Sequence, residues 1–198
     1  VKEIVRMGNM ARHNVEVGMQ ALEDKDENKI KYVLEHEPVI DALEEDITRY
    51  LTKMSEKEMG AELSAMHTRL LHACTDIERI GDHGEALAKD ARRMFEDDVK
   101  FSEEAKTELR ALGELVMQAS GKAMEALANN DKVLAQEAWD ICRQVKKAQK
   151  EIRKNHIVRL NEKRCDPVAG FMMMEILINL KRVSDHSKNI SQIVLGIF

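Results

Sequence analysis

The sequence predicts an all-α protein made of two tandem three-helix bundles. The composition favours helices, because 4% of the 198 residues are aromatic and only two are proline. One segment also occurs twice, as DIERIGDHGEAL at 76–87 and NLKRVSDHSKNI at 179–190. Asp82 and Asp185 in these copies lie 103 positions apart. A repeat of about half the chain indicates two copies of one helical unit, which we place at 1–98 and 99–198.

The first two helices of the first unit are predicted from their apolar periodicity. Apolar and small residues recur every three or four positions over 2–22, and a second stripe follows over 26–53. Pro38 lies inside the second stripe and cannot donate a backbone hydrogen bond. We therefore expect a kink in this helix.

The third helix of the first unit is predicted from a cap and an apolar seam. Ser55 and Glu58 form a capping-box pattern. The seam that follows includes Leu63 and Met66 and reaches Leu87 with a spacing of three and four residues. This pattern predicts a long helix whose seam faces the core.

The second unit repeats this order with clearer boundaries. Ser102 is a candidate N-cap, and Asp166 followed by Pro167 is a typical helix start. The three predicted helices cover 103–128, 131–162 and 167–197.

Charge and cysteine content exclude several classes of protein. The net charge of −5 argues against a nucleic-acid-binding protein, which would carry a basic stripe over one face. The three cysteines are far apart and show no CxxC spacing, so we expect a reducing, cytoplasmic location. No apolar run reaches the ~18 residues that a membrane span needs.

Two pairs of acidic residues form a candidate metal site. In each pair the carboxylates are four residues apart and therefore share one helical face. Their mutual repulsion would be relieved by a cation, and oxygen ligands suit Ca²⁺, Mg²⁺, Mn²⁺ or Fe³⁺. The principal candidates are Glu37, Asp41, Glu78 and Asp82. The secondary candidates are Glu44, His83, Glu85 and Asp185.

Two other interpretations of these carboxylates stay open. Charged residues make up 34% of the chain, so the pairs can be a solvated acidic surface. They can also be neutralised by salt bridges to Arg79 or Lys89. Either case leaves a metal-free helical interaction module as the alternative function.

The second unit lacks most of the acidic pattern. The glutamate at position 78 is replaced by Lys181, and at an offset of 105 the acidic pair of the second helix is replaced by Cys142 and Lys146. Asp185 alone keeps its acidic character, and its spacing from Lys181 predicts a salt bridge. We therefore expect the second unit to bind no metal.

The helix predicted over 131–162 carries a strong positive charge. Nine basic and two acidic residues lie between Arg143 and Arg164, whereas thirteen acidic and six basic residues lie between Glu23 and Glu62. The basic helix is either a solvated surface or a surface for anionic lipid headgroups or an acidic partner. Opposite charges on the two units would also allow a homo-oligomer.

Several motifs resemble those of the PhoU family. ERIGDH at 78–83 and the spacing Glu37-x-x-x-Asp41 match the family's two signatures. Three further stretches resemble the PhoU-type cytoplasmic region of bacterial Na/Pi-cotransporter family proteins: IVRMGNMA at 4–11, ITRYLTKMSE at 47–56 and NHIVRLNEKRCDPVAGF at 155–171.

The resemblance implies a soluble regulator of phosphate uptake with two three-helix bundles and no catalytic activity. Its partner would be the membrane domain of a phosphate transporter, at the cytoplasmic face, or a phosphate-sensing kinase. The resemblance also implies iron, zinc or another divalent cation at acidic pairs. A di-iron carboxylate enzyme is disfavoured, because none of the seven histidines follows a glutamate by three positions.

Overall fold

The computed structural model describes residues 1–55 and 60–197. This part of the chain contains α-helices and no strand, which confirms the predicted all-α class. The helices are α1 (Lys2–Asp24), α2 (Glu27–Ser55), α3 (Ala61–Glu96), α4 (Glu103–Asn129), α5 (Lys132–Asn161) and α6 (Pro167–Leu195). Across the same residues, none of these helices combines the length and apolar character needed to cross a bilayer.

Side-chain caps fix the starts of the three helices in the second bundle. The Ser102 side chain accepts a hydrogen bond from a backbone N–H in the first turn of α4. Asp131 and Asp166 do the same at the starts of α5 and α6, and Pro167 occupies the first turn of α6. These caps explain why the predicted boundaries of the second bundle agree closely with the structure.

The predicted start of the third helix is wrong. Ser55 is the last residue of α2, so it does not cap α3. The N-cap of α3 is Gly60, which has no side chain with which to make a capping bond. The proposed capping partner Glu58 lies outside the described residues.

The first turns of α3 are exposed, contrary to the predicted core seam. Leu63 and Met66 are 44% and 46% exposed. The reason is the register of α1 on α3, which is set where Gly18 packs against Gly84. In this register the α3 residues before about 66 lie beyond the first residue of α1, so that helix cannot cover them.

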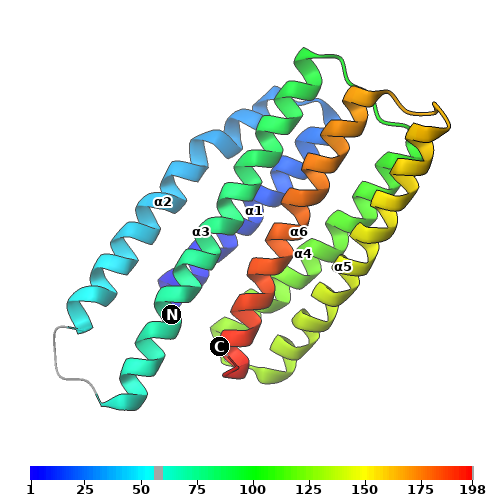
Figure 1. The fold of residues 1–198 in the computed structure, drawn as a ribbon. Coiled ribbons are helices and arrows are strands. Elements are labelled where there is room, and N and C mark those ends of the chain that lie inside the picture. The colour runs from blue at the N-terminus through cyan, green and yellow to red at the C-terminus, as the bar shows by residue number, and fades with distance from the viewer. Residues whose placement is uncertain (56–59, 198) are drawn as a thin grey trace.

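The two bundles lie side by side, with α3 and α6 at the seam between them (Figure 1). Helix α2 packs on α1 and α3, and α5 packs on α4 and α6. Helix α1 also contacts α4 across the seam. Buried side chains from both bundles, such as Ile77 and Leu180, belong to one continuous core. The division of the chain into separate domains at 98/99 stays a prediction.

The sequence repeat is also a repeat of burial. Every buried residue of α2 has a buried equivalent 105 positions later in α5, as for Ile40 and Val145. Every buried residue of α3 from 73 to 91 has a buried equivalent 103 positions later in α6, as for Ile80 and Val183. Surface positions of the two bundles can therefore be compared one by one.

Candidate functional site

Three of the four principal candidates converge between α2 and α3. Glu37 and Asp41 lie one turn apart on α2, and Asp82 faces them from α3. One carboxylate oxygen from each lies within 4.8 Å of the others. Since metal–oxygen bonds are about 2.0–2.6 Å long, a single cation can contact three oxygens at this separation. The residues present therefore fit a hard cation.

Crowded carboxylates disfavour ionisation of Glu37. Burial, followed by a hydrogen bond and the negative charge of Asp41, raises the pKa of Glu37 to about 7 from the ordinary 4.5. The charges of Glu85 and Asp82 act in the same direction. The negative charges of the cluster favour a proton on Glu37, and a bound cation would neutralise them in place of that proton.

Glu78 lies next to the cluster, and its carboxylate is not one of the three convergent groups. Burial, and then the charge of Asp82, raise the pKa of Glu78 to about 7. Arg79 acts in the opposite direction, and Asp41 adds to the rise. Glu78 therefore interacts electrostatically with the cluster, but its carboxylate is not among the three that could contact one cation.

Both salt bridges anticipated at this site are present. Arg79 Nη1 lies 2.7 Å from Asp82 Oδ2, and Arg79 Nε lies 3.5 Å from Glu78 Oε2. Lys89 Nζ lies 2.6 Å from Glu85 Oε2. The Arg79 side chain is 54% exposed, so releasing Asp82 to a cation would sacrifice only a weak surface ion pair.

The remaining secondary candidates have other partners. Glu44 accepts a hydrogen bond from the Thr48 hydroxyl at 3.0 Å. Asp185 pairs with Lys181, as their spacing predicts. These contacts leave Glu44 beside the cluster and Asp185 in an ion pair of the second bundle.

His83 points towards α6 rather than towards the carboxylate cluster. Its Nδ1 lies 3.1 Å from Asn179 Oδ1, and its ring stacks on His186 with centroids 5.8 Å apart. His186 Nδ1 in turn lies 2.8 Å from Asp76 Oδ1. Burial is the main cause that lowers the pKa of His83. Residue 76 and residue 179 are equivalent in the repeat, so each histidine bonds the equivalent position in the other bundle.

We call this reciprocal arrangement the crossed histidine contact. Asn189 Nδ2 also donates to Asp76 Oδ1 at 2.9 Å, and Asn179 Nδ2 donates to Asp90 Oδ2 at 3.1 Å. Sequence reasoning identified the histidines but missed Asp76 and Asn179. Their shared offset of 103, the same as that of the histidines, was the signal that could have found them.

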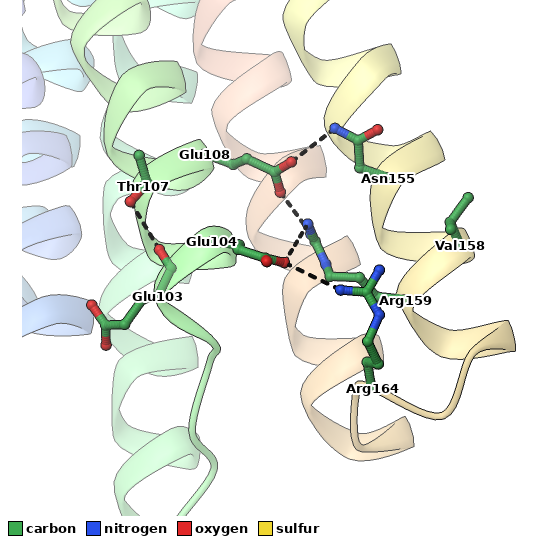
Figure 2. A pocket seen from close by; sticks show the side chains of 8 residues that line it. All are labelled: Glu103, Glu104, Thr107, Glu108, Asn155, Val158, Arg159 and Arg164. Atoms are coloured by element: carbon green, nitrogen blue, oxygen red, sulfur yellow. Dashed lines mark hydrogen bonds and ion pairs between the residues drawn. The ribbon is translucent and has the colours of Figure 1, made fainter.

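A second polar site lies between the start of α4 and the end of α5 (Figure 2). The buried guanidinium of Arg159 donates to Glu108 at 2.6 Å, and Asn155 donates to the same carboxylate at 2.9 Å. Arg164 lies 3.7 Å from Glu104. Both arginines of this pocket pair with glutamates of α4. These ion pairs hold α4 against the end of α5. No sequence motif indicated this site, because its residues lie about 50 positions apart.

Comparison with known proteins gives the family. A family model described as the PhoU domain matches the chain twice, at residues 4–91 and 109–194. The chain belongs to the PhoU family. The expected family is thus confirmed, and both bundles carry the PhoU match.

Curated PhoU relatives align along most of the chain. A "Phosphate-specific transport system accessory protein PhoU homolog" from Xylella fastidiosa is 26% identical over 196 residues, covering 98% of this chain and 81% of the relative. A relative of the same name from Clostridium acetobutylicum is 30% identical over 95 residues, covering 46% of this chain and 43% of the relative.

Solved PhoU structures share the fold. PhoU from Pseudomonas aeruginosa superposes with a TM-score of 0.92 at 22% identity, covering 99% of this chain and 93% of that protein. The phosphate transport system regulatory protein PhoU from Streptococcus pneumoniae gives a TM-score of 0.87 at 18% identity, with 99% and 91% covered. The predicted arrangement of two repeated helical units is therefore confirmed.

Proposed function

We propose that this chain is a non-enzymatic accessory protein that regulates phosphate uptake at the cytoplasmic face of a transporter. Membership of the PhoU family and the names of its curated relatives support this role. The partner is the membrane domain of the transporter or a phosphate-sensing kinase. The stretches resembling the cytoplasmic region of Na/Pi cotransporters favour a transporter of that class.

The proposed regulatory ligand is a divalent or trivalent metal ion, such as iron or zinc, held by α2 and α3. The convergence of Glu37, Asp41 and Asp82 within 4.8 Å carries this proposal. Glu78 would contribute negative charge beside the ion, because a bound cation would offset the charges of Asp82 and Asp41 that oppose its ionisation. The ion would neutralise the cluster and lock α2 against α3.

Elemental analysis of the purified protein tests the metal site. We expect stoichiometric metal in the parent protein and none in a variant with Asp41→Asn and Asp82→Asn. Asp185→Asn is the matched control, because it changes the position equivalent to Asp82 in the second bundle. Equal metal content in the parent and the double variant would contradict the assignment.

Phosphate uptake tests the regulatory role. In a bacterial strain that lacks its own PhoU protein, expression of this chain should restore control of labelled-phosphate uptake. The double variant should fail to restore control while remaining folded by circular dichroism. A chain that leaves uptake unchanged would contradict the role itself, whatever its metal content.

A metal-free interaction module is the second candidate. The ion pair between Arg79 and Asp82 favours it, because that arginine already neutralises one carboxylate of the cluster. Under this alternative, a metal-free parent protein and the double variant would both restore control of uptake.

A further inference from the structure

We propose that the outer face of α5 and α6 docks on an anionic lipid bilayer, with basic side chains at the headgroups and apolar side chains in the interface. The surface lies on the second bundle, whereas the carboxylate cluster lies on the first. The proposal therefore goes beyond the regulatory role above, and its test requires neither metal nor phosphate.

Basic side chains line one side of α5, because their spacing places them on successive turns of one face. All are exposed, and they extend along about 16 Å of the helix. They are Arg143, Lys146, Lys147, Lys150, Arg153 and Lys154. In the part of the chain that the structure describes, only the first and last have acidic partners, Asp140 and Glu151. Four positive charges are therefore uncompensated.

Helix α6 extends this basic surface. Cys142 Sγ donates to the backbone oxygen of Ser184 at 3.3 Å, which places the middle of α5 beside the middle of α6. Three of the acidic positions on α2 and α3 are occupied here by Lys146, Lys181 and Lys188. The position of Asp82 keeps an acidic residue, Asp185, which pairs with Lys181. The equivalent residues of the first bundle, Asp41, Glu78 and Glu85, lie close enough to affect the ionisation of the carboxylate cluster. Because the two bundles repeat the same fold, the three lysines occupy one surface of the second bundle.

Large apolar side chains project from the same two helices. Phe171 and Ile178 are 57% and 50% exposed on α6, and Ile157 is 47% exposed on α5. Ile157 continues the basic stripe of α5, seven residues after Lys150, which is two helical turns. The equivalent residues of the first bundle are exposed threonines: Thr52, Thr68 and Thr75. The fold therefore does not require apolar residues at these positions, and their presence in one bundle indicates a role at the surface.

A bilayer interface suits both halves of this pattern. Anionic headgroups attract lysine and arginine, and the boundary between headgroups and acyl chains accepts phenylalanine and isoleucine. Lysine side chains can extend their charge to the headgroups while their stems lie along apolar surface. A second copy of this chain would offer acidic residues to the lysines, and it is the competing occupant that sedimentation velocity distinguishes below. The observations favour the bilayer.

Vesicle co-sedimentation of the full chain tests the proposal. We expect binding to phosphatidylcholine vesicles that contain phosphatidylserine, weaker binding as salt is raised, and little binding to phosphatidylcholine alone. A basic residue near an anionic surface contributes up to about fivefold to the binding affinity, so four of them contribute at most about 600-fold. Because not every side chain reaches the headgroups, we expect Lys146→Gln, Lys147→Gln, Lys150→Gln and Arg153→Gln together to weaken binding at least about tenfold.

A matched control separates this surface from net charge. A second variant neutralises four exposed lysines elsewhere, with Lys2→Gln, Lys31→Gln, Lys53→Gln and Lys100→Gln. It should bind vesicles nearly as well as the parent. Equal losses in the two variants, or equal binding of the parent to both kinds of vesicle, would overturn the proposal.

A third variant tests the apolar contribution by installing the residues of the first bundle. Ile157→Thr, Phe171→Thr and Ile178→Thr keep every charge and should still weaken binding severalfold. All the substituted positions are exposed, and unchanged thermal melts would show that the variants fold. Sedimentation velocity tests the second copy as occupant. A dimer that the α5 variant disrupts, in a protein that binds no vesicles, would assign this face to self-association and overturn the bilayer proposal.

Discussion

Replacing Glu78 with glutamine should stabilise the metal-free protein at neutral pH. Burial, followed by the charge of Asp82, raises the pKa of this carboxyl to about 7 from 4.5. The folded state therefore binds the proton more tightly than the unfolded state does. The associated stability is fully present below pH about 4.5 and is lost as the pH rises through about 7. Glutamine keeps the shape of the protonated side chain and cannot ionise.

The expected gain follows from the size of this difference. A difference of about 2.5 pH units corresponds to at most about 3 kcal/mol at pH 8. The Glu78 side chain is 20% exposed and loses a 3.5 Å ion pair with Arg79 on substitution, so solvent screening and the lost pair reduce the gain. We expect about 1–2 kcal/mol, which raises Tm by roughly 2–8 °C in a chain of this length.

Thermal and urea unfolding in the presence of a chelator measure this effect. The variant should be more stable than the parent at pH about 8, and the two should converge near pH 4.5. Adding a metal that occupies the site should stabilise the parent more than the variant, because the variant lacks one negative charge beside the ion. A gain of the same size at every pH, or a less stable variant at pH about 8, would refute the electrostatic reasoning.

Three further predictions concern the contacts that hold the helices together. A Cβ at Gly84 would lie 2.9 Å from the α1 backbone, so Gly84→Ala should lower the free energy of unfolding by about 2 kcal/mol in urea titrations. Gly121→Ala, where the nearest atom is 3.7 Å away, should instead be neutral or add up to about 1 kcal/mol. His186→Ala removes a partner of half-buried Asp76 and should destabilise the chain by about 1–3 kcal/mol; an unchanged urea midpoint would mean that the crossed histidine contact adds no stability. Arg159→Met removes the charged partner of Glu108 and leaves that carboxylate with the Asn155 hydrogen bond alone, so it should reduce the free energy of unfolding by about 3 kcal/mol in urea titrations. A loss below about 1 kcal/mol would show that the Asn155 hydrogen bond alone satisfies the carboxylate.

The sequence predicted what depends on periodicity and local capping. The second bundle was placed closely because Ser102 and Asp166 are side-chain caps, whose effect extends over only a few residues. The start of α3 was misplaced because Gly60 caps it without a side-chain bond. Leu63 was predicted to be buried because periodicity identifies an apolar face, whereas its cover depends on the register of α1.

Sequence spacing fixes the relative positions of candidate residues only where they share a helix. The pair Glu37 and Asp41 follows from a spacing of four, but the approach of Asp82 to them depends on how α2 packs against α3. The bond from His83 to Asn179 joins residues 96 positions apart, and no local pattern indicates it. The tertiary arrangement therefore decided which candidates meet.

The crossed histidine contact has the geometry of an interface between two identical subunits related by a dyad. In a true dimer of identical chains, every substitution appears on both sides of the axis, so an acidic surface on one half requires an acidic surface on the other. Joining the halves in one polypeptide removes that constraint. After duplication and fusion, the first bundle can keep carboxylates while the second acquires lysines at the equivalent positions. A single protein then carries an acidic surface and a basic surface on a nearly symmetric backbone.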